Sequence, residues 1–331
     1  LQSGWSRDTI GSHVVRNNTI FDCEQTWICG SLGAIYSRVE NNHIYNIWAK
    51  RQFNGAEMAG IKFHAAIDTL IRRNRIHHAG RGMWMDWMTQ GTRITGNLCY
   101  ANTTDDLYVE VNHGPFLVDN NLFLSGINLH DFSEGGAYAH NLFGGKIRCE
   151  PVPRRSTPYH PAHSTAVAGV ANIKGGDNRY FNNLFLGPPQ KADEFGLFTY
   201  NKQNLAVLAG GNVYFNGAHP CSQETDPLVI SDVDPHLEIA EEGERVVLKL
   251  TLGGALKKAG PARVTPERLG KTQVSGLPYA NPDDSPVEID VDYFGAKRGD
   301  APTPGPFENP AVDRLELKVW GYPPSSRVTN R

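Results

Sequence analysis

The sequence predicts an all-β fold, a right-handed parallel β-helix with long loops and a C-terminal β-rich capping segment. First, an asparagine followed by apolar residues recurs along the chain, most often every 20–24 residues. Second, the segments between these asparagines are short and alternate apolar with polar residues, and the 34 glycines indicate frequent turns. Third, asparagine tolerates left-handed backbone and forms side-chain ladders between stacked coils. Leucine-rich repeats share the period, but their LxxLxL consensus is absent here.

The repeat places one asparagine in each predicted coil. The repeat asparagines are Asn18, Asn42, Asn74, Asn97, Asn121, Asn141, Asn183 and Asn212. The long interval before Asn183 contains the segment 146–180, whose prolines and polar residues predict an excursion from the solenoid.

The chain is expected to divide into two parts. Residues 1–222 carry the repeats and form the parallel β-helix. Residues 223–331 contain two strands around an EEGE turn (237–252) and a Pro/Gly-rich extension. We expect this second part to pack on the solenoid and cap it, because an open β-helix end exposes unpaired strand edges.

Composition excludes several classes of partner. The net charge is −3, with 32 basic and 35 acidic residues, so no nucleic acid or anionic membrane surface is expected as a partner. The sequence contains no run of 18 apolar residues, so no membrane span is predicted. The five scattered cysteines are interpreted as buried free thiols. The opening residues resemble the middle of a longer chain, so the compartment, cytoplasmic or secreted, and a homo-oligomeric state both stay open.

Two acidic residues occupy equivalent positions in successive repeats. Asp86 lies 11 residues before Asn97, and Glu110 lies 11 residues before Asn121. Equivalent positions of stacked coils lie about 4.8 Å apart. The alternation in LYVEVN directs Glu110 outward, together with Tyr108 and Asn112. In the same register, Asp86 points outward, Trp87 inward and Met88 outward.

This alignment predicts one functional patch. A column His64–Asp86–Glu110–His130 is flanked by a second column Lys62–Trp84–Tyr108–Asn128, with one gap needed to place His64. Asn112 and His113 complete the substrate-binding set predicted from the alignment, and Asp105 is expected in a turn before the strand.

Two neighbouring carboxyl groups suit glycoside hydrolysis with retention, which needs about 5–5.5 Å between them. Inverting enzymes need a wider separation. Repulsion between like charges raises one pKa, as a general acid requires. The bland alternative is a pair of solvated or structural acids, with the histidines as ion-pair partners.

The chain resembles glycoside hydrolase family 120, parallel β-helix enzymes of the β-xylosidase type. The resemblance is carried by NGAEMAGIKFHAAID (54–68), GMWMDWMTQGTRITGN (82–97), DLYVEVNHGPFLVDNN (106–121) and DYFGAKRGDAPTPGPFENP (292–310). It implies that Asp86 is the nucleophile, that Glu110 is the acid/base, and that Glu57 binds substrate hydroxyls. Members of this family are longer, with further N-terminal coils and an inserted β-sandwich. The implied substrate is a β-linked xylo-oligosaccharide or similar pentoside, and the implied mechanism needs neither metal nor organic cofactor.

Other functions remain open at this point. A polysaccharide lyase or epimerase could use the same fold with calcium or with a DPH motif, which occurs at Asp234–His236, beyond the repeats. A non-catalytic carbohydrate-binding solenoid is a further alternative. The pair His77–His78, and His160 with His163, could ligate a metal, although such histidines in turns are more often plain surface residues.

Overall fold

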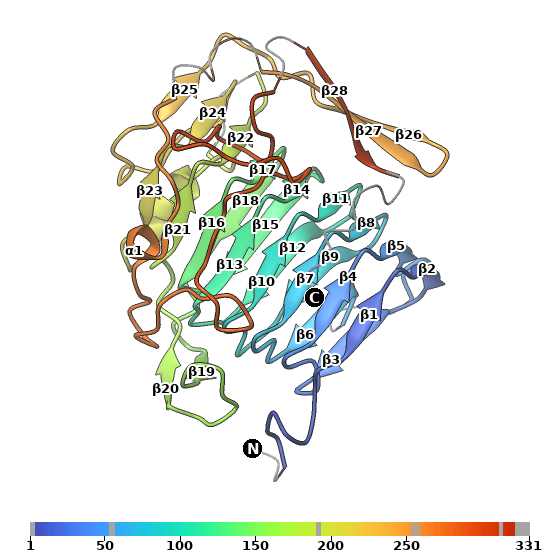
Figure 1. Cartoon of the computed structure of the whole chain (residues 1–331), viewed down its shortest axis with the longest axis vertical. Helices are drawn as coiled ribbons and strands as arrows, with labels where there is room; N and C mark the ends of the chain where they lie inside the picture. The colour runs from blue at the N-terminus through green and yellow to red at the C-terminus, as the bar shows by residue number, and fades with distance from the viewer. Residues whose placement is uncertain are drawn as a thin grey trace.

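The computed structural model describes residues 4–52, 57–189, 193–252, 254, 256, 259–310 and 314–321. They form a parallel β-helix whose coils stack from the N-terminal coils (blue) to the later coils (yellow) (Figure 1). Three sheets, A, B and C, run along the stack, and neighbouring strands in each are parallel. The predicted fold class is therefore confirmed.

Each coil contributes one strand to a sheet in turn. Sheet A contains β1 (Val14–Arg16), β4 (Arg38–Glu40), β7 (Leu70–Arg72), β10 (Arg93–Thr95), β13 (Phe116–Asp119), β16 (Gly136–Ala139), β21 (Arg179–Phe181) and β23 (Leu208–Gly210). Sheet B contains β2 (Thr19–Cys23), β5 (His43–Ile47), β8 (Arg75–His77), β11 (Leu98–Tyr100), β14 (Leu122–Phe123), β17 (Leu142–Phe143), β22 (Leu184–Leu186), β24 (Val213–Phe215) and β25 (Leu228–Ile230). Sheet C contains β3 (Ile28–Ser31), β6 (Ala59–His64), β9 (Arg81–Met85), β12 (Asp105–Glu110), β15 (Ile127–Phe132) and β18 (Lys146–Cys149).

The repeat asparagines form a buried ladder between sheets A and B. In each coil the side-chain amide donates to the carbonyl of the next ladder asparagine, from Asn18 to Asn212, at 2.9–3.0 Å. The last rung, Asn212, donates to Glu224 at 2.8 Å. The residue with positive φ is the one before each ladder asparagine, at Asn17, Asn41, Arg73, Gly96, Asn120, His140, Asn182 and Gly211. The left-handed turn and the ladder are thus made by adjacent residues.

The interior is filled by stacked apolar side chains. Phe123, Phe143, Phe185 and Tyr214 stack in successive coils, with ring centroids 5.0–5.5 Å apart. All five cysteines are free, and three of them, Cys99, Cys149 and Cys221, are buried. The prediction of free thiols is confirmed, but the expected burial is wrong for Cys29, which is exposed, and for Cys23, which is partly exposed.

The C-terminal residues cover two outer faces of the solenoid. A three-stranded antiparallel sheet of β26 (Glu238–Glu242), β27 (Arg245–Thr251) and β28 (Arg314–Trp320) packs its apolar side chains against sheet B. The short helix α1 (Pro266–Leu269) and the extension after it pack against sheet A (Figure 1). The expected strands around the EEGE turn are present. Because β25 extends sheet B past residue 222, the two-part division of the chain stays a prediction.

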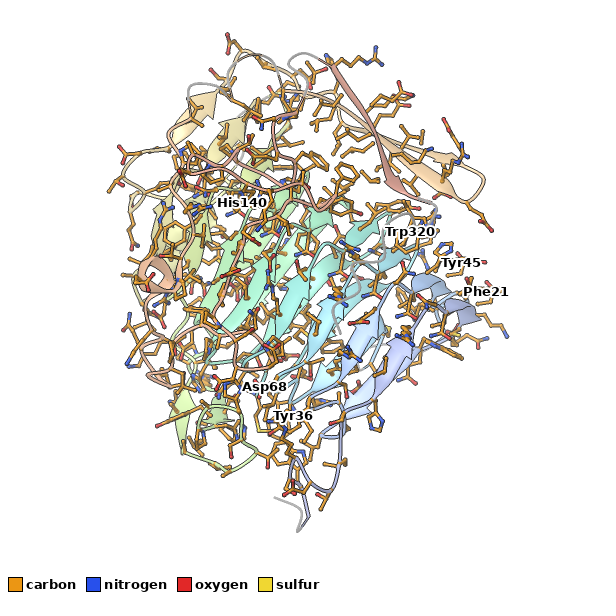
Figure 2. All side chains as sticks on the ribbon, viewed as in Figure 1. Phe21, Tyr36, Tyr45, Asp68, His140 and Trp320 are labelled. Atoms are coloured by element: carbon orange, nitrogen blue, oxygen red, sulfur yellow. The ribbon has the colours of Figure 1, made fainter. Side chains whose placement is uncertain are left out.

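The predicted excursion is an arm beside sheet C. After β18 the chain forms the antiparallel pair β19 (Ser156–Tyr159) and β20 (Gly169–Asn172) and then returns to sheet A through β21. Contacts to the solenoid hold the tip of the arm; among them, Tyr36 donates to the carbonyl of His163 at 3.1 Å, and the His163 ring lies 2.8 Å from Asp68. Tyr36 and Asp68 are neighbours in Figure 2. A short 3-10 helix, η1 (Phe198–Lys202), follows later in the chain.

No helix in the described part of the chain is long and apolar enough to span a membrane.

The ladder generates a stability prediction. Asn97→Ala removes the carbonyl that accepts from the backbone and side chain of Asn74, which leaves buried donors unpaired. We expect a loss of about 3 kcal/mol in the free energy of unfolding, measured by denaturant titration. The control Asn172→Ala, at an exposed arm position, should cost under about 0.5 kcal/mol. Equal losses in both variants would contradict a structural role for the ladder.

Candidate active site

Asp86 and Glu110 lie in register on adjacent strands of sheet C. Trp84 pairs with Tyr108, and Met85 pairs with Val109, so the next positions along are Asp86 and Glu110. On the other side Lys62 pairs with Trp84 and Phe63 with Met85, which sets His64 beside Asp86. The register expected for these three coils, including the one-residue gap, agrees with the pairing.

The predicted position of His130 is wrong. His130 pairs with Tyr108, and Phe132 is the neighbour of Glu110. The coil between Asn121 and Asn141 has fewer residues than the coil between Asn97 and Asn121. Only some of the missing residues are lost before β15, and the rest are lost after it, so counting back from Asn141 gives the wrong partner for Glu110. The column on this face therefore reads Lys62–Trp84–Tyr108–His130 beside His64–Asp86–Glu110–Phe132.

Asp86 is a nearly buried carboxylate with three donors. Its Oδ2 lies 2.6 Å from Nζ of Lys62 and 2.9 Å from Nε2 of His64, and its Oδ1 accepts from the backbone N–H of Trp87 at 2.7 Å. Lys62 is fully buried, and its ammonium also lies 3.3 Å from Glu57 and over the Trp84 ring. A buried ammonium needs such partners, so this group fixes the Asp86 carboxylate in position.

Glu110 has a different environment. Its Oε2 accepts from Nε1 of Trp84 at 3.1 Å, and its Oε1 lies 3.6 Å from Arg155. Partial burial raises the pKa of Glu110, and the charge of Asp86 raises it further, whereas Arg155 and the Trp84 hydrogen bond lower it. The net direction is upward, so Glu110 keeps its proton to higher pH than an ordinary glutamic acid.

Aromatic rings form the floor next to the carboxylates. Trp84 and Tyr108 lie 5.2 Å apart between ring centroids, and Tyr108 stacks on His130 at 4.7 Å. The guanidinium of Arg81 lies over both Trp84 and Tyr108 and forms an ion pair with Asp105. Asp105 is therefore not a turn residue, because it begins β12 and is fully buried.

Three predicted substrate-binding residues are not on this face. Val111 has a positive φ of 51°, which ends the alternation and turns Asn112 inward, where its amide donates to Met85 and Ser133. His113 is buried against Glu134 at 2.6 Å and against carbonyls of the arm at 3.1 Å.

Other predicted positions on this face are also wrong. Asn128 is buried and donates to Asp106 and Ser125, so its expected place beside Tyr108 is also wrong. β9 ends at Met85, after which the predicted alternation fails. Met88 is buried with a φ of 69°, and Trp87 is partly exposed with its ring 6.0 Å from His64.

Arg155 is a site residue that sequence reasoning missed. It lies immediately before β19 in the arm, 45 positions after Glu110, and no repeat pattern relates the two residues. His113 and Gln90 anchor the arm to the solenoid through its backbone carbonyls. The only available signal was the basic pair Arg154–Arg155 within the predicted excursion.

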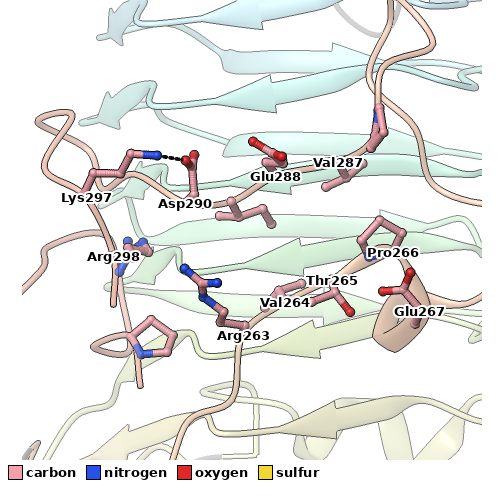
Figure 3. A pocket seen from close by; sticks show the side chains of 13 residues that line it. Arg263, Val264, Thr265, Pro266, Glu267, Val287, Glu288, Asp290, Lys297 and Arg298 are labelled. Carbon is pink, nitrogen blue, oxygen red and sulfur yellow. Dashed lines mark hydrogen bonds and ion pairs between the residues drawn. The ribbon is translucent and has the colours of Figure 1, made fainter. Parts of the chain in front are cut away.

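A groove of about 530 Å³ lies elsewhere, between residues 263–267 and 286–302 of the C-terminal part (Figure 3). Two of its cations are already paired, Lys297 with Asp290 and Arg298 with Glu308. None of the lining residues belongs to the carboxylate pair, so this groove contributes nothing to the chemistry described above.

Comparisons with known proteins agree with this architecture. Residues 5–142 match the family model for the right handed beta helix region. The chain is similar to a solved structure of XylC in complex with xylose, with 41% sequence identity and a TM-score of 0.92. The match covers 96% of this chain and 53% of that one, so the chain spans about half the length of XylC. No curated protein matches the chain.

The contrasting environments predict opposite stability effects of two isosteric substitutions. Because the pKa of Glu110 is raised on folding, its ionised form costs stability at neutral pH, and Glu110→Gln should raise the melting temperature by about 1–3 °C. This gain should vanish below the ordinary glutamate pKa of 4.5. Asp86→Asn leaves Lys62 with Glu57 as its remaining carboxylate partner and should cost about 2–3 kcal/mol, at or below the usual range for a broken buried pair.

Thermal unfolding of both variants from pH 4 to 8 measures these effects. A neutral Asp86→Asn substitution, or a destabilising Glu110→Gln substitution at pH 7, would contradict these assignments.

Proposed function

We propose that this chain carries the catalytic pair of a retaining glycoside hydrolase that removes β-linked xylose, or a similar pentose, from oligosaccharides. The observation that carries the proposal is the pair Asp86 and Glu110, in register on neighbouring coils with unequal environments. The coil spacing of about 4.8 Å suits the separation of about 5–5.5 Å used for retention. The similarity to a structure of XylC with xylose supports the choice of sugar. It also supports the proposed resemblance to glycoside hydrolase family 120.

The proposed reaction has two steps. In the first, a carboxylate oxygen of Asp86 forms a bond to the anomeric carbon. The glycosidic C–O bond breaks, and the Glu110 carboxyl gives its proton to the leaving oxygen. In the second, a water oxygen attacks the same carbon, Glu110 takes the proton of that water, and the Asp86 carboxylate leaves. Two inversions at the anomeric carbon give net retention.

The neighbouring residues have supporting roles in this proposal. Lys62 and His64 fix the Asp86 carboxylate, and Glu57 beside Lys62 is suited to accept from sugar hydroxyls. Because its pKa is raised, Glu110 can supply the proton needed in the first step. His130 would act from a distance, by holding the Tyr108 ring.

The lyase or epimerase alternative has less support. Its DPH motif lies at an exposed position, where His236 and Asp234 face each other at 3.6 Å. EDTA-sensitive turnover with unsaturated products would favour it.

The first test is release of nitrophenol from aryl β-xyloside and other aryl pentosides. Asp86→Ala should lower turnover by at least about 10³-fold, because the covalent step is lost. Glu110→Ala should lose about 10²–10⁴-fold with poor leaving groups. Azide should rescue that variant and give a β-xylosyl azide. The control Asp232→Ala, at an exposed site, should behave as wild type.

Two results would count against this assignment. Activity above a tenth of wild type would remove the carboxylate pair from the mechanism, whether it is found in Asp86→Ala on any aryl pentoside or in Glu110→Ala on a pentoside with a poor leaving group. Xylose binding that survives both substitutions, in a chain with no turnover, would favour the carbohydrate-binding alternative.

The Arg155 contact predicts a pH shift. Activity requires protonated Glu110, so the alkaline limb of the kcat/KM profile follows the pKa of this group. Because the Arg155 charge lowers that pKa, Arg155→Gln should move the limb to higher pH. The neighbouring Arg154→Gln, also exposed, is the matched control and should leave the limb in place. An unchanged or acid-shifted limb in Arg155→Gln would contradict the contact.

A further inference from the structure

A second group of polar side chains lies on the outer face of sheet B. His77 is the last residue of β8, His78 follows it with a φ of 51°, and Glu241 lies on β26 of the C-terminal sheet. One ligand atom from each of these three residues lies within 4.8 Å of the other two. His77 is buried, contrary to the surface position expected for this pair, whereas His78 and Glu241 are accessible.

The distances between these side chains fit a metal site in which a proton is now shared between the two histidine rings. Nδ1 of His77 lies 2.6 Å from Nδ1 of His78 and 3.9 Å from Oε1 of Glu241. Two imidazole nitrogens bound to one zinc ion lie about 3.3 Å apart, given Zn–N bonds of about 2.0–2.1 Å in tetrahedral geometry. The exposed His78 side chain therefore has to move by less than about 1 Å for a metal ion to replace the shared proton.

Neighbouring residues orient the three ligands. Nε2 of His77 lies 2.8 Å from Nε2 of His43, so a proton shared there leaves the Nδ1 lone pair of His77 for a metal. Tyr100 donates to Oε1 of Glu241 at 2.9 Å.

The carboxylate is held from its other side as well. Arg75 lies 3.2 Å from Oε2 of Glu241, which leaves Oε1 facing the histidines. Arg75 and Glu241 cancel in charge, so a bound dication is not neutralised, and an affinity in the micromolar range is expected. A groove of about 360 Å³ borders the site at His78 and is lined also by Trp48, Arg51 and Thr103, among others.

We propose that His77, His78 and Glu241 bind a divalent transition-metal ion of the class that prefers imidazole, such as Zn²⁺, Ni²⁺ or Cu²⁺. The ion ties the C-terminal sheet to sheet B of the solenoid, because two ligands come from β8 and its turn and one comes from β26. This inference is independent of the proposed hydrolase function.

The test is titration of the EDTA-treated, dialysed full chain with Zn²⁺ alone, by calorimetry and thermal unfolding. We expect one ion per chain and a rise in melting temperature. His78→Gln and Glu241→Gln, both at accessible positions, should each weaken binding by at least about tenfold, comparable to the loss of a supporting partner. The control His236→Gln, at a highly exposed histidine, should bind as wild type.

Electron paramagnetic resonance of the Cu²⁺ form gives a second readout. Two imidazole nitrogens should couple to the copper in the wild type and one in His78→Gln. The absence of one-site binding at millimolar Zn²⁺ would overturn the proposal. So would Zn²⁺ binding of equal affinity in wild type, His78→Gln and Glu241→Gln.

Discussion

The asparagine ladder is the constraint on which the rest of the structure depends. The rungs from Asn42 to Asn212 are buried, and from Asn42 to Asn183 each accepts from the preceding ladder asparagine and donates to the next, so a slip of one residue would leave several buried polar groups unpaired. The ladder therefore fixes the start of each coil. Asp86 and Glu110 each lie 11 residues before their ladder asparagine. Once Asn97 and Asn121 are stacked, this equal spacing sets the same register in sheet C, where Asp86 and Glu110 become neighbours. The proposed chemistry follows from a hydrogen-bond pattern on another side of the solenoid.

Register alone places two acids together but does not make them different. That difference comes from the coils on either side: the coil before Asp86 supplies Lys62 and His64, while the coil after Glu110 supplies Phe132. Asp86 thus gains a counter-charge when it leaves water, and Glu110 gains apolar contact and a like charge. A solenoid can separate the roles of two equivalent positions because the coils that flank the pair present different neighbours to each.

The fold, the ladder and the register of three coils could be predicted from sequence, because they depend on spacing and alternation. The position of His130 could not, because the coil after Glu110 is shortened in two places, once before and once after β15, while the sequence shows only the total. Asn112 and Met88 were misplaced for another reason. Residues with positive φ, Val111 and Met88, end the alternation at the strand ends. Arg155 came from an arm outside the repeat, where no periodicity operates.

Arg155 opposes the raised pKa of Glu110, so the site depends on which influence is larger. The arm that carries Arg155 is anchored through His113 and Gln90, but the guanidinium itself is about half exposed, and solvent screens its charge. Partial burial of Glu110 and the nearby Asp86 charge act within the sheet, where screening is weaker, and they determine the net direction. The raised pKa of Glu110 is therefore a property of the stacked coils, and the arm only adjusts it. It follows that arm sequences could change among related solenoids without abolishing the pair, whereas a change in coil spacing could not.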